Sequence, residues 1–154
     1  IFKLRCTGLR FFTVYGPWGR PDMALFKFAK SILNNKFIEL FNFGNHIRDF
    51  TYIDDVVDYI IKLMPAHSKN KIPYQIYNVG SNRPQKLKVF LMHIERLLNK
   101  KAKISYKKLQ SGDVYKTHSD NSLIIKKTKI YPKTKLKDGI EKFISWYKDF
   151  YNRK

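Results

Sequence analysis

Segments with the apolar pattern of strands alternate with amphipathic helical segments along this chain, and that alternation restricts it to α/β packing. Residues 8–15 are rich in aromatic and β-branched side chains, which favours a buried strand. The clearest helix lies in residues 86–99, where six apolar side chains share one face. With 154 residues and a hydrophobic fraction of 44%, the chain can enclose a core. We expect an α/β fold whose later part is a small mixed lobe.

The same periodicity predicts the remaining elements. A helix should begin at Asp22, whose side chain can accept hydrogen bonds from the first free N–H groups, and another should begin at Asp54. Pro65 ends that second helix, because proline interrupts the helical hydrogen bonds. The other predicted elements are strands at 37–43, 50–53, 74–79 and 103–107, a short helix from Asp120, and a last helix at 136–151.

The net charge of +19 bears on the ligands of this chain, because a dense positive field attracts polyanions of any kind. A non-catalytic basic module that binds nucleic acid is therefore one alternative. The basic residues are 24 lysines and 7 arginines spread along the chain, however, whereas base-reading surfaces favour arginine for its bidentate geometry. We therefore expect a solvated basic surface with a local site for a pyrophosphate, and no nucleic-acid partner.

Cysteine, histidine and hydropathy argue against several other classes. Cys6 is the single cysteine, so no internal disulfide can form, which fits a reducing cytoplasm. Neither Cys6 nor His46, His67, His93 and His118 have the spacing of metal ligands, and we expect no metal site. No apolar run approaches the roughly 20 residues of a membrane span, so a membrane partner is not expected.

Three motifs, in this order and spacing, carry most of the functional information. They are Leu-Arg-Phe-Phe-Thr-Val-Tyr-Gly-Pro (9–17) with Arg-Pro-Asp-Met (20–23), Arg-Asp-Phe-Thr-Tyr-Ile-Asp-Asp-Val (48–56), and Tyr-Asn-Val-Gly (77–80). Together they resemble the extended short-chain dehydrogenase/reductase family, the NAD-dependent nucleotide-sugar epimerases and dehydratases. The UDP-glucuronate 4-epimerase branch is the most similar, supported by residues 110–114 and 138–147. The resemblance covers essentially the whole chain.

The resemblance implies a Rossmann-type parallel sheet of which these residues are the C-terminal part. Family members are about twice this length, and their N-terminal half carries a glycine-rich fingerprint for NAD and a Tyr-x-x-x-Lys catalytic pair. The seven glycines here form no such fingerprint, so NAD would be bound mainly by the absent half. The single Tyr-x-x-x-Lys match, Tyr131 to Lys135, is not expected to be catalytic, because Pro132 disfavours helical geometry at Tyr131. This chain alone is therefore expected to be inactive.

The expected division has two parts. Residues 1–35 would be the tail of the NAD-binding domain with a substrate loop, and residues 36–154 the nucleotide-sugar-binding lobe. Without the rest of the sheet, the strand at 8–15 loses its neighbours, so we expect marginal stability or association of this chain. The full-length enzyme implied by the resemblance is a cytoplasmic homodimer.

By resemblance, five side chains would contact the UDP-sugar. Thr13 ends the first strand, where its hydroxyl can meet the sugar, and Arg20 would pair with the sugar carboxylate. Arg48 would bind the diphosphate, since a guanidinium fork matches two phosphate oxygens. Gln110 stands where many relatives have arginine, and Asp113 would hold the ribose hydroxyls. For Thr13 the alternative is an ordinary strand residue, and for Arg20 a solvated loop charge.

Other assignments also have two interpretations. Arg48 could instead form a local ion pair with Asp49 or Asp54. Phe11 and Phe12 could lie beside the nicotinamide of NAD as cofactor-binding residues, or could be core aromatics. The backbone N–H groups of residues 23–25, at a helix start, could contribute to phosphate binding.

The activity implied by the resemblance is 4-epimerisation, which interconverts UDP-glucuronate and UDP-galacturonate. In the full enzyme a tyrosine takes the proton of the 4-hydroxyl, NAD accepts the hydride, and the 4-keto sugar is reduced on its other face after it turns over. The bound UDP must hold the nucleotide while the sugar rotates. Another nucleotide-sugar epimerase, dehydratase or decarboxylase of the same family remains the alternative.

Overall fold

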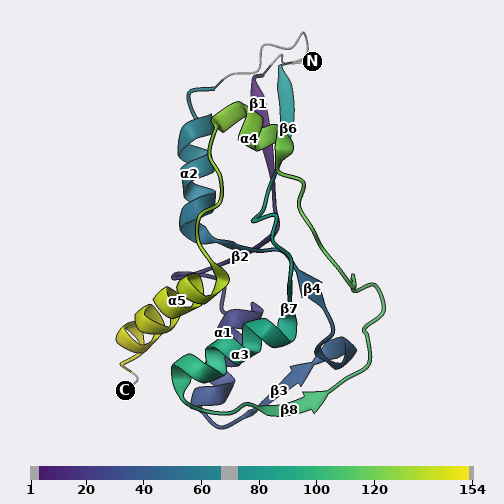
Figure 1. The fold of residues 1–154 in the computed structure, drawn as a ribbon, viewed down its shortest axis with the longest axis vertical. Coiled ribbons are helices and arrows are strands. Elements are labelled where there is room, and N and C mark those ends of the chain that lie inside the picture. The colour runs from purple at the N-terminus through teal and green to yellow at the C-terminus, as the bar shows by residue number, and fades with distance from the viewer. Residues whose placement is uncertain (1–3, 67–72, 153–154) are drawn as a thin grey trace.

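The computed structural model describes residues 4–66 and 73–152 as an elongated molecule with an upper and a lower region (Figure 1). His67 lies outside the described residues. The elements in chain order are β1 (Cys6–Phe11), β2 (Thr13–Tyr15), α1 (Ala24–Leu33), β3 (Phe37–Leu40), the 3₁₀ helix η1 (Phe41–Gly44), β4 (Ile47–Arg48), β5 (Phe50–Tyr52), α2 (Ile53–Leu63), β6 (Tyr74–Val79), β7 (Gln85–Lys86), α3 (Leu87–Leu98), β8 (Lys103–Tyr106), α4 (Ser122–Thr128) and α5 (Leu136–Phe150).

The strands form pairs, and three of these pairs are parallel. β1 pairs with β6, from Cys6 opposite Tyr74 to Phe11 opposite Val79. β2 pairs with β5 and β3 with β8, also in parallel, while β4 and β7 are antiparallel. Since parallel partners need long crossover connections, helices lie between them in the chain. The predicted α/β class with parallel strands is confirmed.

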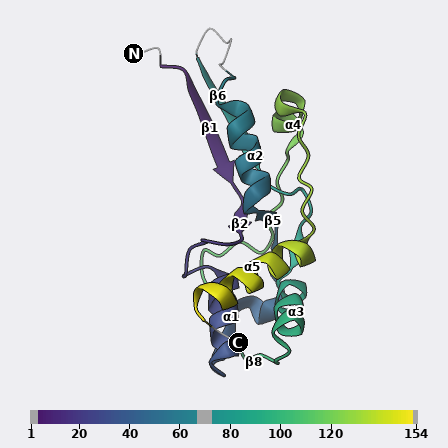
Figure 2. The ribbon, with the colours of Figure 1, turned by 90° about the vertical axis from the view of Figure 1, so that its left-hand side faces the viewer.

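The upper region contains the β1–β6 pair, with α2 and α4 on one of its faces (Figure 2). Its buried apolar residues are Val56, Tyr59, Leu63, Tyr77, Val79 and Ile124. The prediction of one buried strand at residues 8–15 is wrong in two respects. The strand is broken at Phe12, and the side chains of β1 are exposed or half-buried. Among the described residues β1 has β6 as its one strand neighbour, which leaves its other edge open.

The lower region holds the larger hydrophobic cluster, to which α1, α3, α5, β3 and β5 contribute. Tyr15, at the end of β2, lies in this cluster beside Phe50 and Phe90. The rings of Phe50 and Phe90 stack at 4.2 Å with an interplanar angle of 12°. This core fixes α1 and β3, the two elements that flank the cavity described below.

Asp49, which lies in the chain between Arg48 and Phe50, joins three separate segments. Its carboxylate is completely buried. Oδ1 accepts hydrogen bonds from the backbone N–H and hydroxyl of Ser81, and Oδ2 accepts from the backbone N–H groups of Asn82 and Ser119 and from the Ser119 hydroxyl. Burial alone would raise the pKa of Asp49, but the hydrogen bonds from Ser119 and Ser81 outweigh it and hold the pKa below its ordinary value.

Both predicted aspartate caps are wrong. The helix predicted from Asp22 begins at Ala24, and Asp22 instead accepts a hydrogen bond from the Arg20 guanidinium. The helix predicted from Asp54 begins one residue earlier, at Ile53, which places Asp54 inside its first turn. There the carboxylate still suits the positive end of the helix dipole. The expected strand at 37–43 is also shorter, because Asn42 and Phe43 adopt positive φ values of 50° and 52° in η1.

The segment around Tyr131 has the predicted non-helical geometry. It lies between the end of α4 and the start of α5, so Tyr131 and Lys135 do not share a helix. Tyr131 is also 64% exposed. The Tyr-x-x-x-Lys match in this chain therefore lacks the geometry of a catalytic pair.

Candidate functional site

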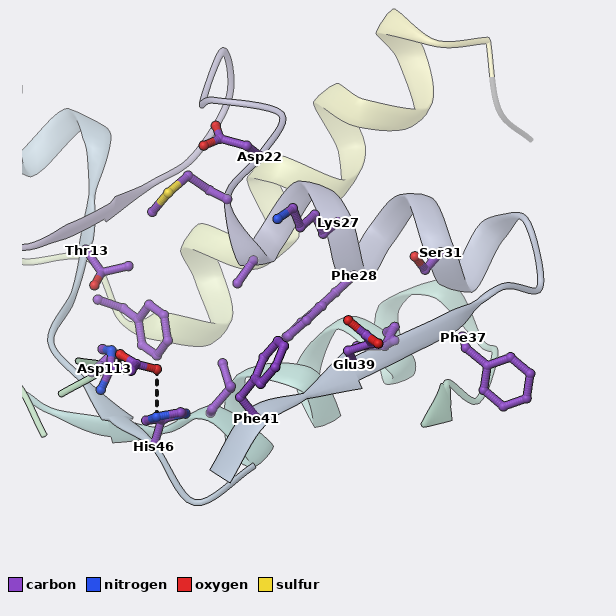
Figure 3. A pocket seen from close by; sticks show the side chains of 16 residues that line it. Thr13, Asp22, Lys27, Phe28, Ser31, Phe37, Glu39, Phe41, His46 and Asp113 are labelled. Atoms are coloured by element: carbon purple, nitrogen blue, oxygen red, sulfur yellow. Dashed lines mark hydrogen bonds and ion pairs between the residues drawn. The ribbon is translucent and has the colours of Figure 1, made fainter. Parts of the chain in front are cut away.

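A cavity of about 540 Å³ lies between α1, β3, η1 and β4. Its lining residues, several of which are labelled in Figure 3, are Thr13, Asp22, Met23, Ala24, Lys27, Phe28, Ser31, Phe37, Ile38, Glu39, Phe41, His46, Arg48, Phe50, Leu87 and Asp113. Asp113 and His46 lie at one end beside Phe41, and Phe37 lies at the other end. The phenyl rings line the part away from His46 and Asp113, together with the polar side chains of Lys27, Ser31 and Glu39.

Arg48 is fixed within this cavity by three hydrogen bonds. Its Nη1 donates to the carbonyls of Ile47 and Tyr115, each at 3.1 Å. Its Nη2 donates to Oδ1 of Asp113 at 2.9 Å, and the Arg48 side chain is 18% exposed. Two carbonyls and one carboxylate thus set the plane of the guanidinium, which leaves further N–H groups for an anionic ligand. The alternative of a local ion pair with Asp49 or Asp54 is wrong, because the partner is Asp113.

His46 lies against the same carboxylate. The imidazole is 4% exposed, and its Nε2 is 3.0 Å from Oδ2 of Asp113. That approach lacks the alignment of a hydrogen bond, so Nε2 has no hydrogen-bond partner within the described structure. Burial lowers the pKa of His46, Arg48 lowers it further, and the opposing effects of Asp113 and the Phe41 backbone do not reverse the shift. The imidazole is therefore neutral near pH 7.

The start of α1 contributes donors to the cavity. Met23 and Ala24 line it, and the first N–H groups of a helix have no partner within the helix. Lys27, one turn further along, adds an ammonium group to the lining. A helix N-terminus, an arginine fork and a lysine give the cavity groups that can bind an anion, alongside the carboxylates of Asp22, Glu39 and Asp113 in the same lining.

The opposite part of the cavity carries three phenyl rings beside the polar side chains of Ser31 and Glu39. Phe28 is buried, Phe41 is half-buried, and Phe37 is 68% exposed at the rim. Such rings can contact a flat heterocycle face to face or edge on. Anion-binding groups and aromatic rings in one cavity together match the two ends of a nucleotide.

The structure brings three of the five predicted substrate residues together. Thr13, Arg48 and Asp113 line the cavity described above. Arg20 does not line it; its guanidinium is exposed, hydrogen-bonded to Asp22, and borders a much smaller cavity that also includes Thr13. Gln110 is exposed outside the lining, and its carbonyl accepts a hydrogen bond from the Asp113 N–H at 3.2 Å.

Sequence reasoning missed several residues at this site. The sequence analysis names His46 only as a possible metal ligand. Its position two residues before Arg48, a predicted phosphate-binding residue, could have indicated that it belongs to the same site. Lys27 and Phe37 carried no signal, because nothing in their spacing distinguishes them from ordinary surface residues. No group of three metal-binding side chains comes together in the described part of the chain. No helix there is long and apolar enough to cross a membrane.

One exposed aromatic ring is the feature of the described residues that suits a planar cofactor ring. A second cavity, of about 600 Å³, is lined by Arg10, Phe11, Phe12, Thr13, Met23, Asn78 and Thr117. Phe11 is 51% exposed, so the core interpretation is wrong for this residue, and its ring is available to a planar ligand. The chain has no Gly-x-Gly-x-x-Gly turn to bind a dinucleotide pyrophosphate. Its fit to NAD is thus limited to an aromatic contact with a planar ring.

Acidification from about pH 7 to pH 5 is expected to lower the free energy of unfolding. Because the folded state holds the pKa of His46 below its ordinary value of 6.5, the unfolded state binds the proton more tightly. The stabilisation is complete above 6.5 and is lost as the pH falls through 6.5 toward the folded value. His93 acts in the same direction, since burial and then Lys137 and Arg96 lower its pKa.

Urea unfolding at both pH values tests this expectation. His46→Gln removes one of the two groups, so its loss of stability on acidification should be smaller than that of the unchanged protein. An equal loss in the two proteins would show that His46 does not contribute.

The sequence of this chain is similar to those of a known enzyme family. A model of the NAD dependent epimerase/dehydratase family matches residues 2–80. Protein CapI of Staphylococcus aureus is 42% identical over 99% of this chain and 50% of its own length. UDP-glucuronate 4-epimerase 4 of Arabidopsis thaliana is also 42% identical, over 99% of this chain and 38% of its own.

A solved structure agrees with these relatives. The UDP-glucuronic acid 4-epimerase of Bacillus cereus, in complex with UDP-glucuronic acid and NAD, is 31% identical with a TM-score of 0.88. The match covers 97% of this chain and 47% of that one, so the chain spans about half the length of such relatives. The matching fold and the family model, which covers just over half of the sequence, show that this chain belongs to the NAD-dependent epimerase/dehydratase family.

Proposed function

We propose that this chain is the nucleotide-sugar-binding part of an NAD-dependent UDP-sugar 4-epimerase, with UDP-glucuronate and UDP-galacturonate as its two sugar nucleotides. The observation that carries the proposal is the convergence of Arg48, Lys27 and the start of α1 on a cavity whose other part is aromatic. The relatives named UDP-glucuronate 4-epimerase support the choice of sugar nucleotide. In this proposal residues 1–35 end the NAD-binding domain and residues 36–154 form the substrate lobe.

The chain's own groups would bind and orient the substrate. The uracil lies between Phe37 and Phe41, and the diphosphate binds Arg48, Lys27 and the free N–H groups of α1. Asp113 accepts hydrogen bonds from the ribose. Gln110, whose carbonyl accepts a hydrogen bond from the Asp113 N–H, would help to anchor the UDP through its exposed side chain.

The sugar would extend toward Thr13 and Arg20. Arg20 has an exposed carboxylate partner in Asp22, and exposed ion pairs of this kind are weak. The sugar carboxylate can therefore replace Asp22 on the guanidinium without a large cost. Thr13 lines both the cavity of about 540 Å³ and the cavity of about 600 Å³ beside Phe11. Its hydroxyl can therefore hold the sugar where these two cavities meet.

The chemical step needs groups beyond these residues. The chemistry supplied by bound NAD is removal and return of a hydride at the sugar 4-carbon, and Phe11 with Phe12 would contact its nicotinamide ring. The residues of this chain instead keep the UDP in place while the sugar turns, which is positioning rather than proton transfer. A homodimeric full-length enzyme and a cytoplasmic location complete the proposal.

Arg48→Ala is expected to weaken UDP binding by about 10- to 100-fold, since hydrogen bonds to a charged group contribute about 1.5–3 kcal/mol. Isothermal titration with UDP measures the effect. Arg96→Ala, at an exposed position on α3 outside the cavity, is the control and should leave the affinity unchanged. If the unchanged protein, Arg48→Ala and Arg96→Ala all bind UDP with the same affinity, Arg48 does not contact the nucleotide.

Two further titrations with the unchanged protein test the remaining assignments. Tighter binding of UDP-glucuronate than of UDP-glucose supports a uronate substrate, and the reverse order favours a sister activity of the family. Salt-sensitive binding of DNA or RNA that UDP does not affect, without UDP binding, would support the nucleic-acid alternative instead.

A further inference from the structure

The ion pair between Arg20 and Asp22 borders the place that the proposed function assigns to the sugar. Asp22 lines the cavity of about 540 Å³ (Figure 3), and Arg20 lines the much smaller cavity. Thr13, Met23 and Ala24 line both of these cavities, so the two adjoin along the same short stretch of chain. A sugar held by Thr13 would therefore lie within reach of this ion pair.

Asp22 covers one complete edge of the Arg20 guanidinium. Nε donates a hydrogen bond to Oδ1 at 3.1 Å, and Nη2 donates to Oδ2, so both carboxylate oxygens accept from the same fork. Two parallel hydrogen bonds are the geometry that carboxylates in general adopt on arginine. Asp22 thus makes, from within the chain, the contact that a sugar carboxylate would make with Arg20.

The contact between Asp22 and Arg20 can be exchanged at little cost. The side chains of Arg20 and Asp22 are 74% and 58% exposed, so water screens their attraction. The hydrogen bond from Arg20 holds the pKa of Asp22 below its ordinary value, and the charge of Lys27 acts in the same direction. The carboxylate is therefore ionised near pH 7, and it still has a cation nearby when a ligand takes its place on Arg20.

We propose that Asp22 replaces the sugar carboxylate on Arg20 whenever a uronate is absent or turning, and thereby limits how tightly the site holds a uronate. The inference rests on the proposed function and adds a positioning residue that acts through Arg20. A uronate must displace Asp22 to reach the guanidinium, whereas a neutral hexose leaves the ion pair intact. During epimerisation the carboxylate must also leave Arg20 so that the sugar can rotate. The return of Asp22 to the guanidinium lowers the cost of that release.

Titrations with UDP-glucuronate and UDP-glucose test the proposal, because these ligands share the diphosphate and differ at the carboxylate. Asp22→Asn removes the competing charge. The affinity ratio of UDP-glucuronate to UDP-glucose should therefore rise about 3-fold above that of the unchanged protein. Asp22→Glu restores a carboxylate and should bring the ratio back toward its original value. Asp58→Asn changes an exposed aspartate on α2 outside both cavities, and this control should leave the ratio unchanged.

A double-mutant cycle with Arg20→Ala separates exchange on the guanidinium from simple charge repulsion. In the Arg20→Ala protein, Asp22→Asn should leave the ratio unchanged, because no guanidinium remains for the two carboxylates to share. A gain that persists without Arg20 would show that Asp22 only repels anionic sugars, and the proposal would be wrong.

Two other results would overturn the proposal. An unchanged ratio in Asp22→Asn would show that Asp22 does not compete with the uronate. A lower ratio would show that Asp22 instead holds Arg20 ready for the substrate. If the unchanged protein binds neither UDP-sugar, the proposed function fails and this inference fails with it. If it binds both while the ratio does not rise in Asp22→Asn, the inference alone fails.

Discussion

Asp49→Ala is expected to lower the free energy of unfolding by about 3–5 kcal/mol, as removal of one partner from a buried charged network does. The carboxylate accepts five hydrogen bonds from Ser81, Asn82 and Ser119, and is fully buried. Without it, three backbone N–H groups and two hydroxyls in closely packed surroundings lose this acceptor. Water cannot easily replace it, because these donors lie between the end of β6 and the segment before α4.

Urea unfolding monitored by circular dichroism measures this loss. Asp58→Ala is the control, because Asp58 is an exposed aspartate on α2, and it should change stability by less than about 0.5 kcal/mol. Asp49→Asn keeps the shape but turns an amide toward donors, so it should fall between the two. An Asp49→Ala protein as stable as the Asp58→Ala protein would contradict the role of this network.

Gly139→Ala should destabilise the protein by about 3 kcal/mol, although the same change inside an exposed helix normally adds about 1 kcal/mol. Gly139 lies on the buried face of α5. A Cβ there would overlap the Tyr15 hydroxyl and lie 2.8 Å from Tyr15 Cζ and from Tyr52 Cδ2. Both tyrosines are fixed in the lower core, so α5 would have to move away from β2 and β5.

Thermal unfolding of Gly139→Ala and Gly8→Ala checks this effect. At Gly8 a Cβ would meet Ile76 at an ordinary 3.4 Å, so that variant should be neutral or slightly more stable. A Gly139→Ala protein that unfolds at the same temperature as Gly8→Ala would show that α5 accommodates the methyl group.

Local patterns predicted most elements of the fold correctly. The helix at 86–99 and the strand at 74–79 agree with α3 and β6 because an amphipathic or alternating pattern directly reflects which side of an element is buried. The helix starts were less accurate. Asp22 has a side chain that commonly caps helices, but in the structure it accepts a hydrogen bond from Arg20 instead. N-cap propensity does not include this competition with a neighbouring arginine.

The candidate site depends on contacts that spacing along the chain does not encode. Arg48 and Asp113 are 65 residues apart and meet only in the folded protein. Family resemblance predicts from the sequence that both residues contact the ligand. It does not predict the ion pair between them. The sequence did not predict His46 as a site residue. Its place in the site depends on its burial next to Asp113, and no local pattern shows that burial.

The parallel pairing of β1 with β6 also affects the order of folding. Cys6 lies opposite Tyr74 and Phe37 opposite Lys103, so both pairs join residues more than 60 positions apart. Contacts this distant close large loops before any stabilisation is gained, which slows folding. During synthesis β1 leaves the ribosome well before β6, the one strand that the described residues place beside it. Both regions therefore depend on closing large loops, the upper one through β1 and β6 and the lower one through β3 and β8.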